Sequence, residues 1–203
     1  MTQTPALPDT RPSFFTALDQ IDALIRTVSL ADLDLPTPCD GWTVRELLGH
    51  LVAVSVRVPH VAAGGHPFEV PSQVTGIADD GWLAAWGERQ DALRAAAADD
   101  KDRSRIVHHP AGEMPWAIAL GTYASELATH GWDLASALGR ADELDQDLAA
   151  AVLPPMLRGL PAEPRGAEVG VPFGPVIEVP DDAAPYAKLV GWLGRDPYWV
   201  RSV

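Results

Sequence analysis

The 203-residue sequence lacks several features that would place it at once in a class of proteins. It has a single cysteine, Cys39, which excludes an internal disulfide. It has no run of about 18 apolar residues, so no transmembrane helix is expected. Its N-terminus lacks the basic and then apolar regions of a secretory signal. Together these absences predict a cytoplasmic protein that has no membrane partner.

Basic residues are also scarce, because 15 Lys and Arg stand against 28 Asp and Glu and give a formal net charge of −13. A surface this acidic repels phosphate backbones, so nucleic acid is not an expected partner. The sequence contains neither a Gly-x-Ser-x-Gly nucleophile elbow nor a Gly-rich phosphate loop. Serine-hydrolase and nucleotide-dependent chemistry are therefore not expected.

Apolar residues recur at helical spacing along most of the chain, which predicts a mainly α protein. The first expected helix begins after Ser13, which would be its N-cap, and the second begins at a capping box formed by Thr43 and Glu46. Three further helices are expected over about 79–98, 115–139 and 145–158. The composition of residues 104–115 predicts a short extended segment. The tail adds a strand-like Val176–Val179 and a short helix near 183–194. We expect a four-helix bundle over residues 1–160, with a C-terminal appendage over 161–203 packed on it.

Three side chains of this pattern are candidate metal ligands. Glu126 and His130 lie four residues apart, so one helix presents both on one face. His50 lies on the apolar face of another expected helix, where an imidazole needs a partner. If the two helices pack together, the three groups can bind one divalent ion, most simply zinc, and leave a coordination position open. The alternative, a core histidine held by a nearby carboxylate, stays open.

Other residues have open roles at this stage. Asp133 could orient an imidazole, cap a helix or pair with an arginine. His108 and His109 are neighbours, so at most one faces inward on an extended segment. Cys39 is either a thiol near a helix N-terminus or a small packed residue. Trp132, with His109 and Asp133, is a candidate pocket residue.

Two motifs together resemble a known family. Thr37–Leu51 (TPCDGWTVRELLGHL) and Glu126–Ala135 (ELATHGWDLA) are similar to the two metal motifs of the actinobacterial mycothiol-dependent maleylpyruvate isomerase-like proteins, members of the DinB-like superfamily of four-helix bundles. Phe173–Pro185 and Leu193–Pro197 resemble the tail of one subfamily. The resemblance covers most of the chain.

The resemblance implies a DinB-like bundle in which His50, Glu126 and His130 hold zinc. It also implies mycothiol as a thiol cosubstrate, activated as the thiolate to attack a small electrophile. The protein would then be an S-transferase or a cis–trans isomerase. A metal-dependent hydrolase and a non-catalytic metal- or small-molecule-binding bundle remain as alternatives. Exposed helix faces leave a homodimer open.

Overall fold

The computed structural model describes residues 7–99 and 102–201 of the chain. The helices are α1 (Arg11–Ile25), α2 (Val44–Ala62), α3 (Trp82–Gly87), α4 (Gln90–Ala98), α5 (Trp116–Ala137), α6 (Gln146–Gly159) and α7 (Pro185–Trp192). Strands β1 (Ile106–His109) and β2 (Gly112–Pro115) form an antiparallel hairpin in which Val107 pairs with Met114. Short 3-10 turns cover Leu30–Asp32, Pro67–Glu69, Ala141–Glu143 and Ala167–Val169. The prediction of a mainly α bundle is confirmed.

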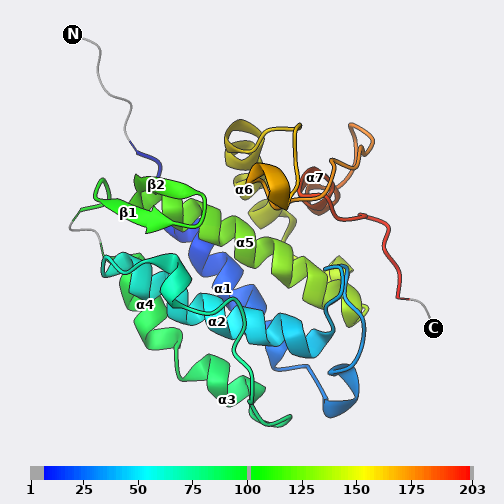
Figure 1. The fold of residues 1–203 in the computed structure, drawn as a ribbon. Helices are drawn as coiled ribbons and strands as arrows, with labels where there is room; N and C mark the ends of the chain where they lie inside the picture. The colour runs from blue at the N-terminus through cyan, green and yellow to red at the C-terminus, as the bar shows by residue number, and fades with distance from the viewer. Residues whose placement is uncertain (1–6, 100–101, 202–203) are drawn as a thin grey trace.

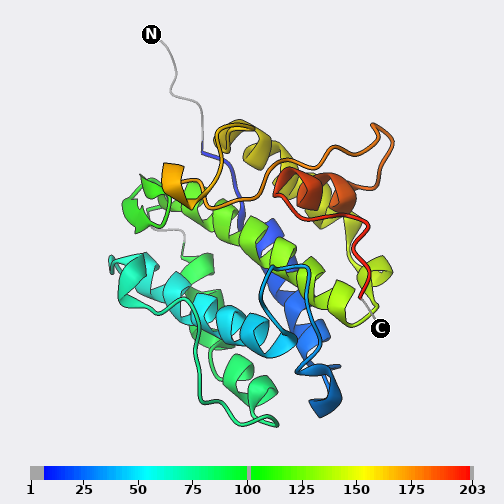
Figure 2. The ribbon, with the colours of Figure 1, turned by 45° about the vertical axis from the view of Figure 1, so that its right-hand side comes forward.

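Helix α5 is the centre of the molecule. It packs against α1, α2 and α6, and its side chains are buried on nearly all sides, as expected of a helix that is apolar all round. Figures 1 and 2 show α2, α3 and α4 on one side of α5 and α6 with α7 on the other. The hairpin lies at the N-terminal end of α5 (Figure 1). This arrangement places the buried faces of α2 and α5 against each other.

Two expected helix boundaries were wrong. Helix α1 begins at Arg11 with Thr10 as N-cap, three residues before the position that a Ser13 cap predicts. The Thr10 hydroxyl donates to the Ala117 carbonyl at 2.8 Å, which ties this start to α5. The helix expected over 79–98 is two helices, α3 and α4, and the break follows Gly87, a residue that weakens helix interiors.

The C-terminal tail contains the expected short helix, α7, but the expected strand at Val176–Val179 is absent from the described residues. The segment lies between Pro175 and Pro180, which supply no N–H donors to a ladder. Its Ile177 N–H instead donates to the Gly191 carbonyl near the end of α7, at 2.9 Å.

One buried apolar cluster runs through the bundle and includes Leu189 and Val190 of α7. The division at residue 160 therefore stays a prediction, and its ranges include residues outside the described part. In the described residues, no helix combines the length and apolar character needed to cross a membrane.

Candidate metal centre

The structure brings the three predicted ligands together. His50 lies on α2, and Glu126 and His130 lie one turn apart on α5. One ligand atom from each lies within 4.8 Å of the other two. The two imidazole rings have centroids 4.6 Å apart, and His50 Nε2 is 3.2 Å from Glu126 Oε1. Packing of α2 against α5 therefore creates the triangle that the spacing suggested.

The orientation of His50 is set by a backbone carbonyl. Its Nδ1 lies 2.8 Å from the Ser72 carbonyl oxygen, which can only accept a hydrogen bond. The proton of a neutral His50 is therefore on Nδ1, and Nε2 carries a lone pair. That lone pair faces the Glu126 carboxylate.

The orientation of His130 is set by a carboxylate. Asp133, one turn later on α5, is fully buried, and its Oδ2 lies 3.0 Å from His130 Nδ1. The carboxylate accepts the Nδ1 proton, so Nε2 of His130 also presents a lone pair. Histidines that bind a metal usually donate their other ring N–H to a carboxylate or a carbonyl oxygen in this way.

These donors fit a divalent cation. With both protons on Nδ1, Nε2 of His50 and Oε1 of Glu126 are two acceptors 3.2 Å apart. Two atoms bound to one tetrahedral zinc ion at about 2.0 Å lie about 3.3 Å apart. A cation between them would satisfy lone pairs that otherwise repel. Two imidazoles and one carboxylate are also a donor set that zinc accepts.

The centre is covered on one side and reachable on another. The Trp42 ring lies 5.0 Å from the His50 ring and stacks 6.0 Å from that of His130. The side chains of His50 and His130 are about 10% exposed, whereas that of Glu126 is 25% exposed. Arg57, buried on α2, places Nη1 3.7 Å from Glu126 Oε1. A small molecule would therefore approach from the side of Glu126.

The charges around the triad shift its pKa values. Burial acts to raise the pKa of Glu126, but a protonated His50, whose Nε2–H then donates to the carboxylate, and the positive charges of protonated His130 and of Arg57 lower it to about 2. Glu126 is therefore already a carboxylate before His50 loses its Nε2 proton and takes the neutral form described above. Burial lowers the pKa of His130 despite the hydrogen bond to Asp133. The ligands are thus held as a carboxylate and a neutral imidazole, the forms that bind metal.

The other candidates lie outside the triad. His109 is half-buried; its Nδ1 accepts from the Ala111 N–H at 3.1 Å and its Nε2 lies 2.8 Å from the Thr122 hydroxyl, so both nitrogens are used within the protein. His108 is exposed near Glu113. Burial raises the pKa of the Cys39 thiol to about 11, which opposes a role as nucleophile.

Sequence reasoning did not identify two groups around the ligands, the Ser72 carbonyl and Arg195. The Ser72 carbonyl lies in a loop, and backbone atoms carry no sequence signal. Asp133 pairs with Arg195, whose Nη2 lies 3.1 Å from Oδ2, so the carboxylate both orients an imidazole and pairs with an arginine. A buried aspartate predicts a cation nearby, but spacing alone did not show which one.

Gly49 allows the Ser72 loop to reach His50. A Cβ on Gly49 would lie 2.6 Å from the Val74 carbonyl oxygen, and the Val74 N–H donates to the Gly49 carbonyl at 3.0 Å. We expect Gly49→Ala to displace this loop, free the His50 ring and lower zinc affinity about 10-fold. Competition with a chromogenic chelator measures the change. Gly87→Ala is the control, because its Cβ would meet no atom within 4 Å. Equal affinities in both variants would contradict the role given to the loop.

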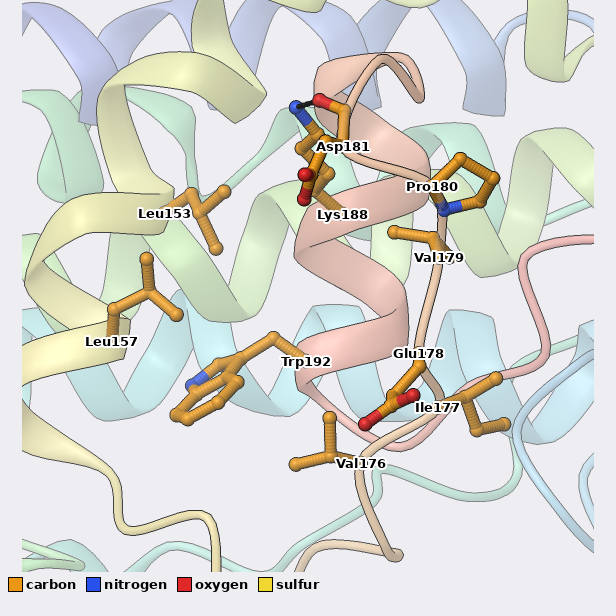
Figure 3. Close-up of a pocket in the computed structure, with 10 residues that line it drawn as sticks. All are labelled: Leu153, Leu157, Val176, Ile177, Glu178, Val179, Pro180, Asp181, Lys188 and Trp192. Carbon is orange, nitrogen blue, oxygen red and sulfur yellow. Dashed lines mark hydrogen bonds between the residues drawn. The ribbon is translucent and has the colours of Figure 1, made fainter.

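A separate groove of about 480 Å³ is lined by residues of α6, α7 and the Val176–Asp181 segment. Figure 3 shows Leu153 and Leu157 of α6 facing Trp192, with the extended Val176–Asp181 segment opposite. The triad lies instead on α2 and α5, so the groove and the candidate metal centre are distinct features.

Comparison with known proteins gives three kinds of match. The model of the mycothiol maleylpyruvate isomerase N-terminal domain family matches residues 14–135. Two uncharacterised proteins of Mycobacterium tuberculosis, from strains CDC 1551 and H37Rv, are each 31% identical over 179 residues, 88% of this chain and 93% of the relative.

Among solved structures, the chain is similar to the crystal structure of the mycothiol-dependent maleylpyruvate isomerase, with a TM-score of 0.52 and 17% identity. A histidine-to-alanine mutant of that enzyme gives a TM-score of 0.52 and 16% identity. Each match covers 73% of this chain and 70% of the other. At this identity the likeness shows a common fold.

Proposed function

Because the chain belongs to the mycothiol maleylpyruvate isomerase N-terminal domain family, we propose that it is a zinc-dependent enzyme that uses a low-molecular-weight thiol. The thiol is mycothiol, and its sulfur attacks a small electrophile. The reaction is either a cis–trans isomerisation, in which the thiol adds to a double bond and later leaves, or an S-transfer, in which it stays attached. His50, Glu126 and His130 are the proposed metal ligands.

The observation that supports this proposal most directly is the convergence of lone pairs from His50, Glu126 and His130 at a site that is accessible from one side. Both histidines are fixed through Nδ1, so Nε2 of each is available to a metal. The partly exposed Glu126 carboxylate marks the accessible side. Three protein ligands with an open position are the pattern of catalytic rather than structural zinc.

Zinc bound there would lower the pKa of a coordinated thiol, so that the thiol binds as the nucleophilic thiolate. The surrounding residues would orient the ligands, exclude water and supply a positive charge. Asp133 holds the His130 ring in place, and the Trp42 ring shields both histidines from water. Arg57 places a positive charge beside Glu126, which favours an anionic sulfur or substrate group on this side.

The test uses the purified full-length protein loaded with zinc, mixed with mycothiol and with maleylpyruvate as the first electrophile. We expect conversion to the trans isomer, followed by proton NMR, only when zinc and mycothiol are both present. A panel of other electrophiles with mycothiol tests S-transfer by mass spectrometry. Cobalt substitution reports thiol binding by a sulfur-to-metal charge-transfer band. A metal-loaded protein that shows no such band with mycothiol would refute the thiol-dependent function.

A further inference from the structure

The C-terminal part of the chain reaches the candidate metal centre through one side chain. Helix α7 ends at Trp192, and Gly194 follows with a φ of 80°. The Arg195 N–H then donates to the Val190 carbonyl at 2.9 Å, which closes the helix in the manner of a glycine C-cap. A Cβ on Gly194 would lie 2.7 Å from Gly174, so this turn also needs glycine for space. The chain therefore turns sharply at Gly194, immediately before Arg195.

The Arg195 guanidinium meets Asp133 at two points. Nε lies 3.3 Å from Oδ1 and Nη2 lies 3.1 Å from Oδ2, the forked geometry in which arginine binds a carboxylate. Asp133 is 0% exposed, and the Arg195 side chain is 16% exposed. A carboxylate removed from water in this way requires a partner charge.

The same Asp133 oxygen connects this pair to the metal centre. Oδ2 accepts from Arg195 Nη2 and from His130 Nδ1, so the position of one carboxylate fixes both. Arg195 Nη2 also lies 3.7 Å from Cys39 Sγ, in the turn that leads to Trp42. The Trp42 ring in turn stacks on His130. One guanidinium thus contacts two of the segments that surround this imidazole.

We infer that Arg195 is a positioning residue for His130: by fixing the Asp133 carboxylate it fixes the imidazole ring, so the C-terminal appendage helps to set the metal affinity of the bundle. The family model ends at residue 135, so this support comes from a part of the chain outside it. The consequence for metal affinity rests on the proposed function, whereas the effect on the His130 ring does not.

The test compares Arg195→Gln with Arg165→Gln in the full-length protein. Arg165 is the matched control, because it also holds the appendage together, by stacking on Trp192 and donating to the Pro161 carbonyl, away from Asp133. Two quantities are measured: the ring nitrogen and Nδ1–H resonances of His130 by NMR in metal-free protein, and the zinc dissociation constant by chelator competition.

We expect Arg195→Gln to shift the His130 resonances and weaken zinc binding about 10-fold or more, and Arg165→Gln to do neither. In an Asp133→Asn background, Arg195→Gln should cause little further loss of zinc affinity, because the inferred effect of Arg195 on His130 passes through the Asp133 carboxylate. If Arg195→Gln does not fold, Arg195→Lys replaces it; lysine keeps the charge but lacks the fork, so a smaller loss in the same direction is expected.

Unchanged His130 resonances in folded Arg195→Gln, or in its lysine replacement, would overturn the inference, as would equal changes in Arg165→Gln. Additive losses of zinc affinity in the Asp133→Asn background would also overturn it. Two results together would refute the proposed function and leave the positioning role standing: the wild type binds no zinc, and the His130 resonances shift in the Arg195 variant but not in Arg165→Gln.

Discussion

Replacement of His130 by alanine is expected to abolish stoichiometric zinc binding, the largest effect that the site predicts. The wild type should carry about one zinc per chain after purification, because three converging ligands are enough for a tight site. Without His130, only His50 and Glu126 remain, and two ligands do not hold zinc through gel filtration. His50→Ala and Glu126→Gln should have the same result, the latter because a neutral amide replaces the only anionic ligand. Elemental analysis of the purified proteins measures the metal.

The control for this experiment is His108→Ala, which removes an exposed histidine outside the triad. It should retain zinc in full. Thermal unfolding gives a second readout, because a ligand at about 100 times its Kd stabilises the folded state by about 2.7 kcal/mol. Added zinc should raise the Tm of the wild type and of His108→Ala, but not that of the triad variants. A triad variant that retains stoichiometric zinc would remove that residue from the site.

Trp86→Ala should cause a large loss of stability, about 3 kcal/mol in the free energy of unfolding. Trp86 lies on α3, is 0% exposed and belongs to the core between α3, α1 and α2. Truncation of a buried Trp costs about 3–5 kcal/mol through lost burial and the cavity left behind. Among the described residues, none accepts a hydrogen bond from its indole N–H, so losing that group offsets part of the cost. Urea unfolding measures the change as a lower midpoint.

Leu83 on the same short helix is the matched control, since it is 40% exposed. Leu83→Ala should change the free energy of unfolding by about 0.5 kcal/mol or less, as is usual at exposed positions. The slope of the unfolding free energy against urea concentration should be the same in all three proteins. Similar losses in the two variants would mean that α3 does not bury Trp86 as described.

The positions of most helices follow from local sequence patterns, which can be read without knowledge of the tertiary structure. The helical spacing of apolar residues predicted the bundle, and the Thr43–Glu46 capping box correctly marked the start of α2. Gly139, with a φ of 72°, follows α5 at the end of the expected 115–139 helix. Glu126 and His130 share a helix face for the same reason, because four residues span about one turn.

Local pattern was less informative where a partner elsewhere in the chain decides the conformation. The start of α1 depends on the contact between Thr10 and Ala117, which are 107 residues apart. The Val176–Val179 segment has the composition of a strand, but no strand lies beside it among the described residues. In both cases the deciding hydrogen bond joins residues that are distant in sequence.

Only the tertiary structure decided how the candidate site is assembled. The distance between His50 and Glu126 depends on the packing of α2 against α5. The Ser72 carbonyl reaches His50 from a loop, and Arg195 reaches Asp133, the partner of His130, from beyond the end of α7. A sequence states which groups can donate, accept or carry charge. Which of them meet depends on long-range packing, because a hydrogen bond requires atoms about 3 Å apart, and only the folded chain sets that distance.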